Sequence, residues 1–162
     1  MKKIITLIVF LSSNSIAQEA VKPDWISVAE LMEKFNSTED FSYMSNLTYR
    51  CSAFFEVWGA MLARDGMQDL ADKFESDAFN MVYAGFAASE AKRGNDFTQM
   101  SQNEKIQGIS EVKNGMMFEL MVKSYINWFT YSYVNYGEYT GDEDLKIELQ
   151  FCNEVAQITK LQ

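Results

Sequence analysis

The sequence predicts an all-α fold: a single-domain, antiparallel bundle of about five helices that is cross-linked by one disulfide. Three observations lead to this prediction. Apolar residues recur at helical spacing along most of the chain. Two capping boxes of the form Ser-x-x-Glu mark helix starts. The 162 residues include only one proline and eight glycines, so few positions interrupt a long helix.

The first helix is expected from Ser27 to about Phe35, after a short extended lead over residues 18–24. Ser27 and Glu30 have capping-box spacing, in which each residue satisfies a backbone N–H at the helix start.

The second helix is expected over residues 40–65, before Gly66, and has the clearest amphipathic pattern in the chain. At 100° per residue its large apolar side chains fall within one arc, and Cys51 falls among them. Cys51 is therefore predicted to be buried. The arc consists of Tyr43, Met44, Leu47, Cys51, Phe54, Phe55, Trp58, Met61 and Leu62.

A third helix is predicted over residues 68–92, and Gly94 lies just beyond its end. The fourth helix should open at the capping box Ser101–Glu104 and continue to about Asn135. Residues 116–128 are apolar nearly all round, which predicts the most buried element of the fold.

The aromatic stretch over residues 128–136 has two interpretations. Aromatic residues alternate with polar ones, as in a strand, yet no partner strand is visible elsewhere in the sequence. We therefore expect the fourth helix to continue through this stretch.

The last helix should begin near Asp142, where acidic residues in the first turn favour the helix dipole. Cys152 lies on its apolar side, so both cysteines of the chain are predicted to point inward. An isolated pair in an oxidising compartment normally forms one structural disulfide, and we expect a Cys51–Cys152 bond. The alternative, a redox-active pair, usually has Cys-x-x-Cys spacing, which is absent.

The N-terminus predicts export. Lys2 and Lys3 precede an apolar run over residues 4–11, and small residues precede a cleavage point after Ala17. The apolar run is far shorter than the roughly 20 residues that span a bilayer. We expect a cleaved signal peptide over residues 1–17, a helical domain over residues 18–162, and a periplasmic or secreted location. Loss of the two lysines lowers the net charge from −9 to −11.

Composition excludes several classes of function. The chain has no histidine, so Ser-His-Asp catalysis, c-type haem attachment and the usual zinc sites are unavailable. The negative charge argues against binding to a nucleic-acid backbone or to anionic lipid headgroups. Clustered methionines at helical spacing are more often core residues than copper ligands. We therefore expect no cofactor and no metal.

Two sets of residues are candidates for function. Glu119 and Glu148 lie among apolar neighbours, and a pair of carboxyl groups with raised pKa values could act as general acid and base. Because Lys123 follows Glu119 by one turn, an ordinary ion pair is the favoured interpretation. A dense aromatic segment is the second candidate, since Tyr and Trp are frequent at interface centres. Its candidate surface residues are Trp128, Tyr131, Tyr133, Tyr136 and Tyr139.

The favoured hypothesis is a non-catalytic envelope protein that binds a protein partner, as an inhibitor, immunity or adaptor protein does. Missing catalytic motifs and surplus aromatic residues motivate it. One alternative is a carboxylate-dependent hydrolase of the cell wall or a glycan. Another is a carrier of a small apolar ligand, held in a cavity between helices.

Overall fold

The computed structural model describes residues 20–160, and the helical prediction is confirmed there: this range contains six α-helices, one short 3-10 helix and no strand. The predicted signal peptide over residues 1–17 lies outside the described residues. The elements are α1 (Val28–Thr38), α2 (Phe41–Arg64), α3 (Gln68–Lys92), η2 (Phe97–Gln99), α4 (Gln102–Lys113), α5 (Met116–Tyr136) and α6 (Glu143–Thr159).

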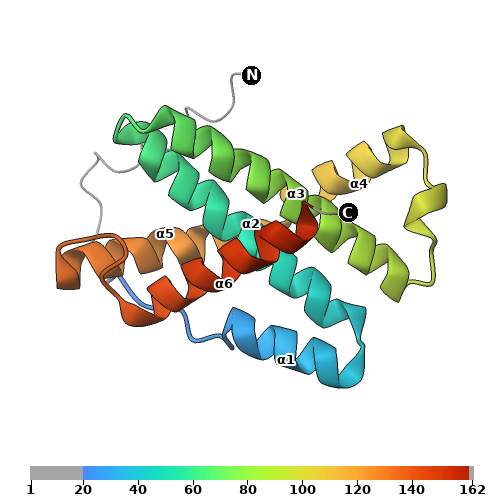
Figure 1. The fold of residues 1–162 in the computed structure, drawn as a ribbon, viewed down its shortest axis with the longest axis horizontal. Helices are drawn as coiled ribbons and strands as arrows, with labels where there is room; N and C mark the ends of the chain where they lie inside the picture. Colours follow the sequence, from blue (N-terminus) through green and yellow to red (C-terminus); the bar gives the residue numbers. More distant parts are fainter. Residues whose placement is uncertain (1–19, 161–162) are drawn as a thin grey trace.

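Helix α2 is the centre of the bundle. It forms a long antiparallel hairpin with α3, and it also contacts α1, α5 and α6 (Figure 1). In this view α6 crosses in front of α2, while α5 passes behind it. Because neighbours surround α2, its buried residues lie on most of its circumference and include polar ones such as Arg50 and Ser52.

Close approach of α2 and α3 depends on Gly85. A Cβ atom at this position would lie 2.5 Å from the Thr48 Oγ1 atom and 2.5 Å from the Tyr49 ring. The two helices are also joined by a hydrogen bond of 2.8 Å, which the Ser52 hydroxyl donates to the Ala78 carbonyl oxygen. A glycine is therefore required for this hairpin to pack as it does.

The predicted fourth helix is in fact two helices, α4 and α5. Asn114 ends α4, and its side-chain amide donates to the Ser110 carbonyl oxygen over 2.8 Å. Gly115 then adopts extended backbone angles (φ −75°, ψ 145°) and begins α5. The two short residues Asn114 and Gly115 thus provide both a C-cap and a change of direction.

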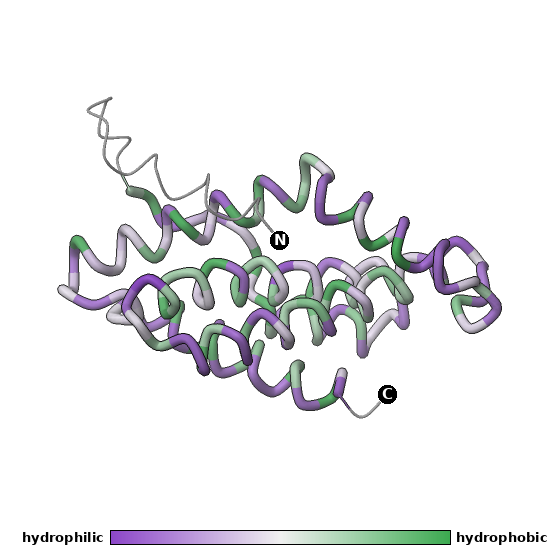
Figure 2. Tube along the Cα trace, turned by 90° about the horizontal axis from the view of Figure 1, so that it is seen from above, coloured by the Kyte–Doolittle hydropathy of each residue, from purple (hydrophilic) through white to green (hydrophobic). Residues whose placement is uncertain are grey.

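The prediction that residues 116–128 form the most buried element is wrong. Met116 and Met117 are 72% and 63% exposed, and Leu120 is exposed as well. The reason is position: α5 is a peripheral helix that packs mainly on α2, so only one of its faces is covered. Figure 2 accordingly shows hydrophobic residues in green on outer turns as well as at the centre. The stretch 128–136 is helical, as expected.

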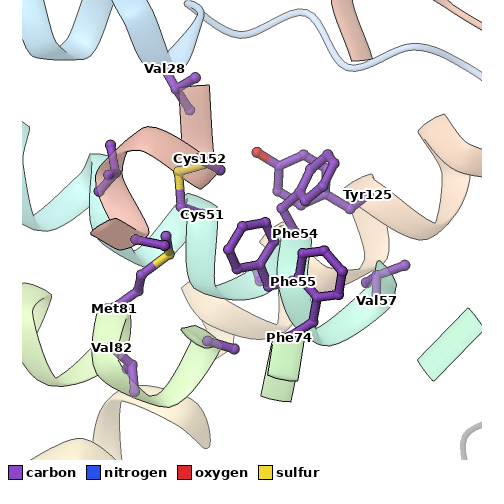
Figure 3. Close-up of a cluster of buried hydrophobic side chains, with 14 of the residues drawn as sticks. Val28, Cys51, Phe54, Phe55, Val57, Phe74, Met81, Val82, Tyr125 and Cys152 are labelled. Atoms are coloured by element: carbon purple, nitrogen blue, oxygen red, sulfur yellow. A yellow bond between two sulfur atoms is a disulfide. The ribbon is translucent and has the colours of Figure 1, made fainter. Parts of the chain in front are cut away.

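The predicted disulfide between Cys51 and Cys152 is present. It joins α2 to α6 with an S–S distance of 2.03 Å and a Cα–Cα distance of 5.2 Å, and both residues are fully buried. Figure 3 shows it beside Phe54, Phe55 and Tyr125 in the aromatic part of the core. Phe54 packs edge-on against Tyr125, with ring centroids 5.2 Å apart.

Candidate functional site

The end of α5 and the loop to α6 form the candidate site. Gly137 ends the helix in the left-handed conformation (φ 79°), and its N–H donates to the Tyr133 carbonyl oxygen. Glycine is the residue that adopts this conformation without strain. The chain then turns through residues 138–142 and enters α6.

Ser132 fixes this loop from inside. Its hydroxyl donates to the Glu138 carbonyl oxygen and accepts from the Asp142 N–H, in both cases over 2.9 Å. Ser132 is fully buried. One hydroxyl thus binds a backbone acceptor and a backbone donor, and it is the partner of the buried Asp142 N–H.

Asp142 fixes the other end of the loop. Its Oδ1 atom accepts from the Leu145 N–H over 3.0 Å, which caps α6, and from the Trp128 indole N–H over 3.1 Å. The loop is tight as well: a Cβ atom on Gly141 would lie 2.3 Å from the Tyr136 Cβ atom. The loop therefore has one well-determined conformation.

Four tyrosines lie on this rigid support, and we call them the tyrosine surface: Tyr131, Tyr133, Tyr136 and Tyr139. Tyr133 and Tyr136 are 51% and 53% exposed, whereas the other two are half-buried. They form two pairs. Tyr133 stacks on Tyr139 with ring centroids 4.8 Å apart, and Tyr131 meets Tyr136 edge-on at 6.4 Å. The negative charge that Tyr131 would carry, followed by desolvation, raises the pKa of Tyr136.

One predicted member of this surface, Trp128, does not belong to it. Trp128 is only 3% exposed and stacks on Tyr125 inside the bundle, with ring centroids 6.1 Å apart. Its indole N–H anchors the loop through Asp142. Trp128 therefore anchors the loop from inside the bundle and is not available to a partner.

Two cations of the chain already contact this region. The Arg64 guanidinium lies over the Tyr139 ring, 5.4 Å from the centroid, and donates to its hydroxyl over 2.6 Å. The Lys22 ammonium lies 5.7 Å from the centroid of the Trp128 ring and forms ion pairs with Asp142 and Asp144. Each cation thus combines an aromatic face with an oxygen acceptor.

A buried polar cluster lies deeper in the bundle, and only one of its members, Glu148, was singled out from the sequence. The Arg50 guanidinium forms an ion pair with the Glu148 carboxylate at 2.6 Å, and the Tyr125 hydroxyl donates to the same carboxylate. The Trp25 ring covers the guanidinium at 4.3 Å, and Arg50 also donates to the Ile26 carbonyl oxygen. Burial, followed by the charge of Glu148, raises the pKa of Tyr125 well above 10.

The two candidate catalytic carboxyl groups lie in different environments. Glu148 is 2% exposed and bound to Arg50, whereas Glu119 is exposed and pairs with Lys123 at 2.7 Å. The structure therefore brings Glu148 together with Arg50 and Tyr125, and not with Glu119.

Two of the surface hollows that residues 20–160 form are open to solvent. One follows α6 beside Thr140, Gln150 and Asn153; the other lies between Phe79 of α3 and Ile106 of α4. Within residues 20–160, no group of three or more His, Cys, Asp or Glu side chains is arranged to hold a metal ion.

No helix in the described part of the chain has both the length and the apolar character needed to cross a membrane. Comparison of the chain with protein-family models, with curated proteins and with solved structures finds no significant match.

Proposed function

We propose that this protein is a non-catalytic, exported binding protein of the cell envelope that recognises another protein through the tyrosine surface. The observation that carries this proposal is the exposure of Tyr133 and Tyr136 in the last turn of α5, next to a loop that hydrogen bonds from the buried Ser132 hold in place. Tyrosine is suited to such a role because it offers a large, rigid contact area and a hydroxyl, at a low cost in conformational entropy.

Rigidity supports the same proposal. A partner that binds a preformed surface does not have to order it, so more of the interaction free energy remains as affinity. The loop anchors Ser132, Trp128 and Asp142 are all buried, and hydrogen bonds join Asp142 to both of the others. The arrangement matches a rigid element with exposed aromatic side chains, as expected of a binding site.

Export is the second part of the proposal. It is supported by the basic and apolar pattern of the first 17 residues and by the disulfide, a bond that persists mainly outside the reducing cytosol. In a bacterial host the periplasm is the compartment that fits both the N-terminal export pattern and the disulfide.

The experiment that tests the binding role is quantitative affinity capture from envelope extract with three immobilised proteins. These are the wild type, the double variant Tyr133→Ala and Tyr136→Ala, and the matched control Phe79→Ala and Ile106→Ala. The control removes exposed apolar area at the hollow between α3 and α4. We expect a stoichiometric partner that the control retains and the tyrosine variant loses. Equal retention by both variants would refute the role of the tyrosine surface.

A further inference from the structure

The chemistry around the tyrosine surface indicates what kind of partner it fits. Resting on the proposed function, we infer that the surface takes an extended protein segment bearing Arg or Lys side chains, with the cations seated on tyrosine faces beside carboxylates.

Charge supports this inference first. The stretch from Tyr133 to Asp144 contains four acidic residues and no Lys or Arg. Glu138 lies between the two exposed tyrosines and Tyr139 in the chain, and it forms no ion pair with any residue in the range 20–160. The whole chain carries a net charge of −9, which attracts a basic partner over distances of about a Debye length, ~8 Å at physiological salt.

The chain's own cations supply the second argument, because they show how the region binds a positive group. Arg64 uses a tyrosine face and the hydroxyl of the same ring. Lys22 uses a tryptophan face and a pair of aspartates, and it does so from the non-helical segment that precedes α1. Lys22 is thus an internal example of the proposed ligand geometry.

The third argument is that the rings of Tyr133 and Tyr136 are still open to a cation. Among the described residues, no Lys or Arg lies over the ring of Tyr133 or Tyr136, although both rings are half exposed. A cation–π contact is stronger when it is desolvated than when it is exposed. A segment that covers these rings and Glu138 together therefore gains from cation–π contacts and from ion pairing. A purely apolar segment would leave Glu138 buried without a partner.

The test uses the full mature chain and two capped peptides. One peptide alternates arginine with glycine; in the other, citrulline replaces arginine, which keeps the shape and removes the charge. Amide and tyrosine-ring chemical shifts are recorded by NMR during titration. We expect saturable shifts confined to residues 131–144 with the arginine peptide, and an affinity at least about fivefold lower with the citrulline peptide.

Variants distinguish binding of the peptide at the tyrosine surface from general electrostatic attraction to an acidic protein. We expect the double variant Tyr133→Ala, Tyr136→Ala to bind the arginine peptide at least about fivefold more weakly than the wild type does. We expect the same of the double variant Glu138→Gln, Glu143→Gln. Glu33→Gln with Glu75→Gln changes the net charge equally at exposed positions of α1 and α3 and should have little effect. Equal weakening by this control, or shifts spread over the whole surface, would overturn the inference.

The inference and the proposed function fail in different ways. If the captured partner depends on Tyr133 and Tyr136 but binds equally well to the Glu138→Gln, Glu143→Gln variant, the binding role stands and the cationic segment is wrong. If the arginine peptide binds at residues 131–144 while no partner depends on the tyrosines, the surface chemistry stands and the proposed function falls.

Discussion

The Arg50 guanidinium and the Glu148 carboxylate lie 2.6 Å apart in the interior, immediately beside the disulfide that joins the same two helices. Cys51 follows Arg50 in the chain, and Cys152 lies one helical turn after Glu148. An ionic bond and a covalent bond therefore fix the register of α2 and α6 at adjacent positions. Because Arg50 and Glu148 are about 3% exposed, solvent screens their attraction very little.

Removing one member of this ion pair should be costly. We expect Glu148→Ala to lower the free energy of unfolding by about 3–5 kcal/mol, because it leaves a buried guanidinium without a counter-charge. Urea unfolding measures the change. Replacing both partners, with Arg50→Met and Glu148→Leu, should cost less than the single change. The control is Glu119→Gln in an exposed pair, expected within about 0.5 kcal/mol of wild type. A loss at Glu148 no larger than at Glu119 would contradict this account.

Removing the disulfide should destabilise the fold through its unfolded state. The bond closes a loop with a sequence separation of 101 residues, for which the chain-entropy model gives up to about 4.7 kcal/mol. We expect Cys51→Ala with Cys152→Ala to approach this value in urea unfolding, since both sites are fully buried and alanine leaves little strain. A wild-type protein whose stability does not change on addition of a reductant, while mass analysis shows two free thiols, would contradict the prediction.

The α2–α3 contact should not tolerate a methyl group at position 85. Gly85→Ala forces the Thr48 hydroxyl and the Tyr49 ring away from their positions, and overpacking of this kind costs about 1–3 kcal/mol. Thermal unfolding followed by circular dichroism gives the change. Ser89→Ala, one turn further along the same helix, removes only the hydroxyl contact to Tyr49 and should cost about 1 kcal/mol or less. The prediction fails if Gly85→Ala is as stable as wild type.

The Ser132 hydroxyl should determine how well the tyrosine surface is ordered. Ser132→Ala leaves the buried Asp142 N–H without a partner and removes one of the two hydrogen bonds that the Glu138 carbonyl oxygen accepts, which costs about 1–3 kcal/mol. We expect faster amide hydrogen exchange over residues 137–142 and weaker partner binding, with all four tyrosines still present. Thr130→Ala, which removes a hydroxyl bonded within α5, is the control. Unchanged exchange in the loop would show that Ser132 does not hold it.

The carboxyl group of Asp40 should titrate unusually low. Its hydrogen bond from Lys92, followed by the bonds from Ser42 at the start of α2, lowers its pKa from 3.8 to about 2. Because the folded-state value is the lower one, the stabilisation is complete above pH 3.8 and is lost as the pH falls towards 2. We expect Lys92→Met to move the pKa back towards 3.8, as followed by NMR. An unchanged pKa in that variant would show that Lys92 is not the main cause.

The sequence could predict the helices and the disulfide because both depend on local periodicity. The arc around Cys51 and the apolar side around Cys152 are each visible within one helix. A break at Asn114–Gly115 was harder to predict, because a single glycine between a polar and an apolar segment is also compatible with a continuous helix. The exposure of Met116 and Met117 depends on which helix occupies the centre, and periodicity within α5 carries no such information.

The candidate site was predictable only as a group of aromatic residues. Composition identified Tyr133 and Tyr136 along with Trp128. That the two tyrosines are exposed and Trp128 is buried depends on how α5 packs and ends at Gly137. Arg50 was missed because a charged residue on α2 normally faces solvent, and its partner lies 98 residues away in α6. Its position next to a buried cysteine was the one local signal for it.

The placement of the Arg50 counter-charge and of the Cys51 partner in α6 has a consequence for a chain that lacks this helix. A chain cut before Glu143 keeps helices α1 to α5, yet its centre would hold a guanidinium without its carboxylate and an unpaired thiol. Such a product cannot reach the native state and remains open to proteolysis, since the penalty falls at the middle of the core. The folded state of α1 to α5 thus depends on the presence of α6.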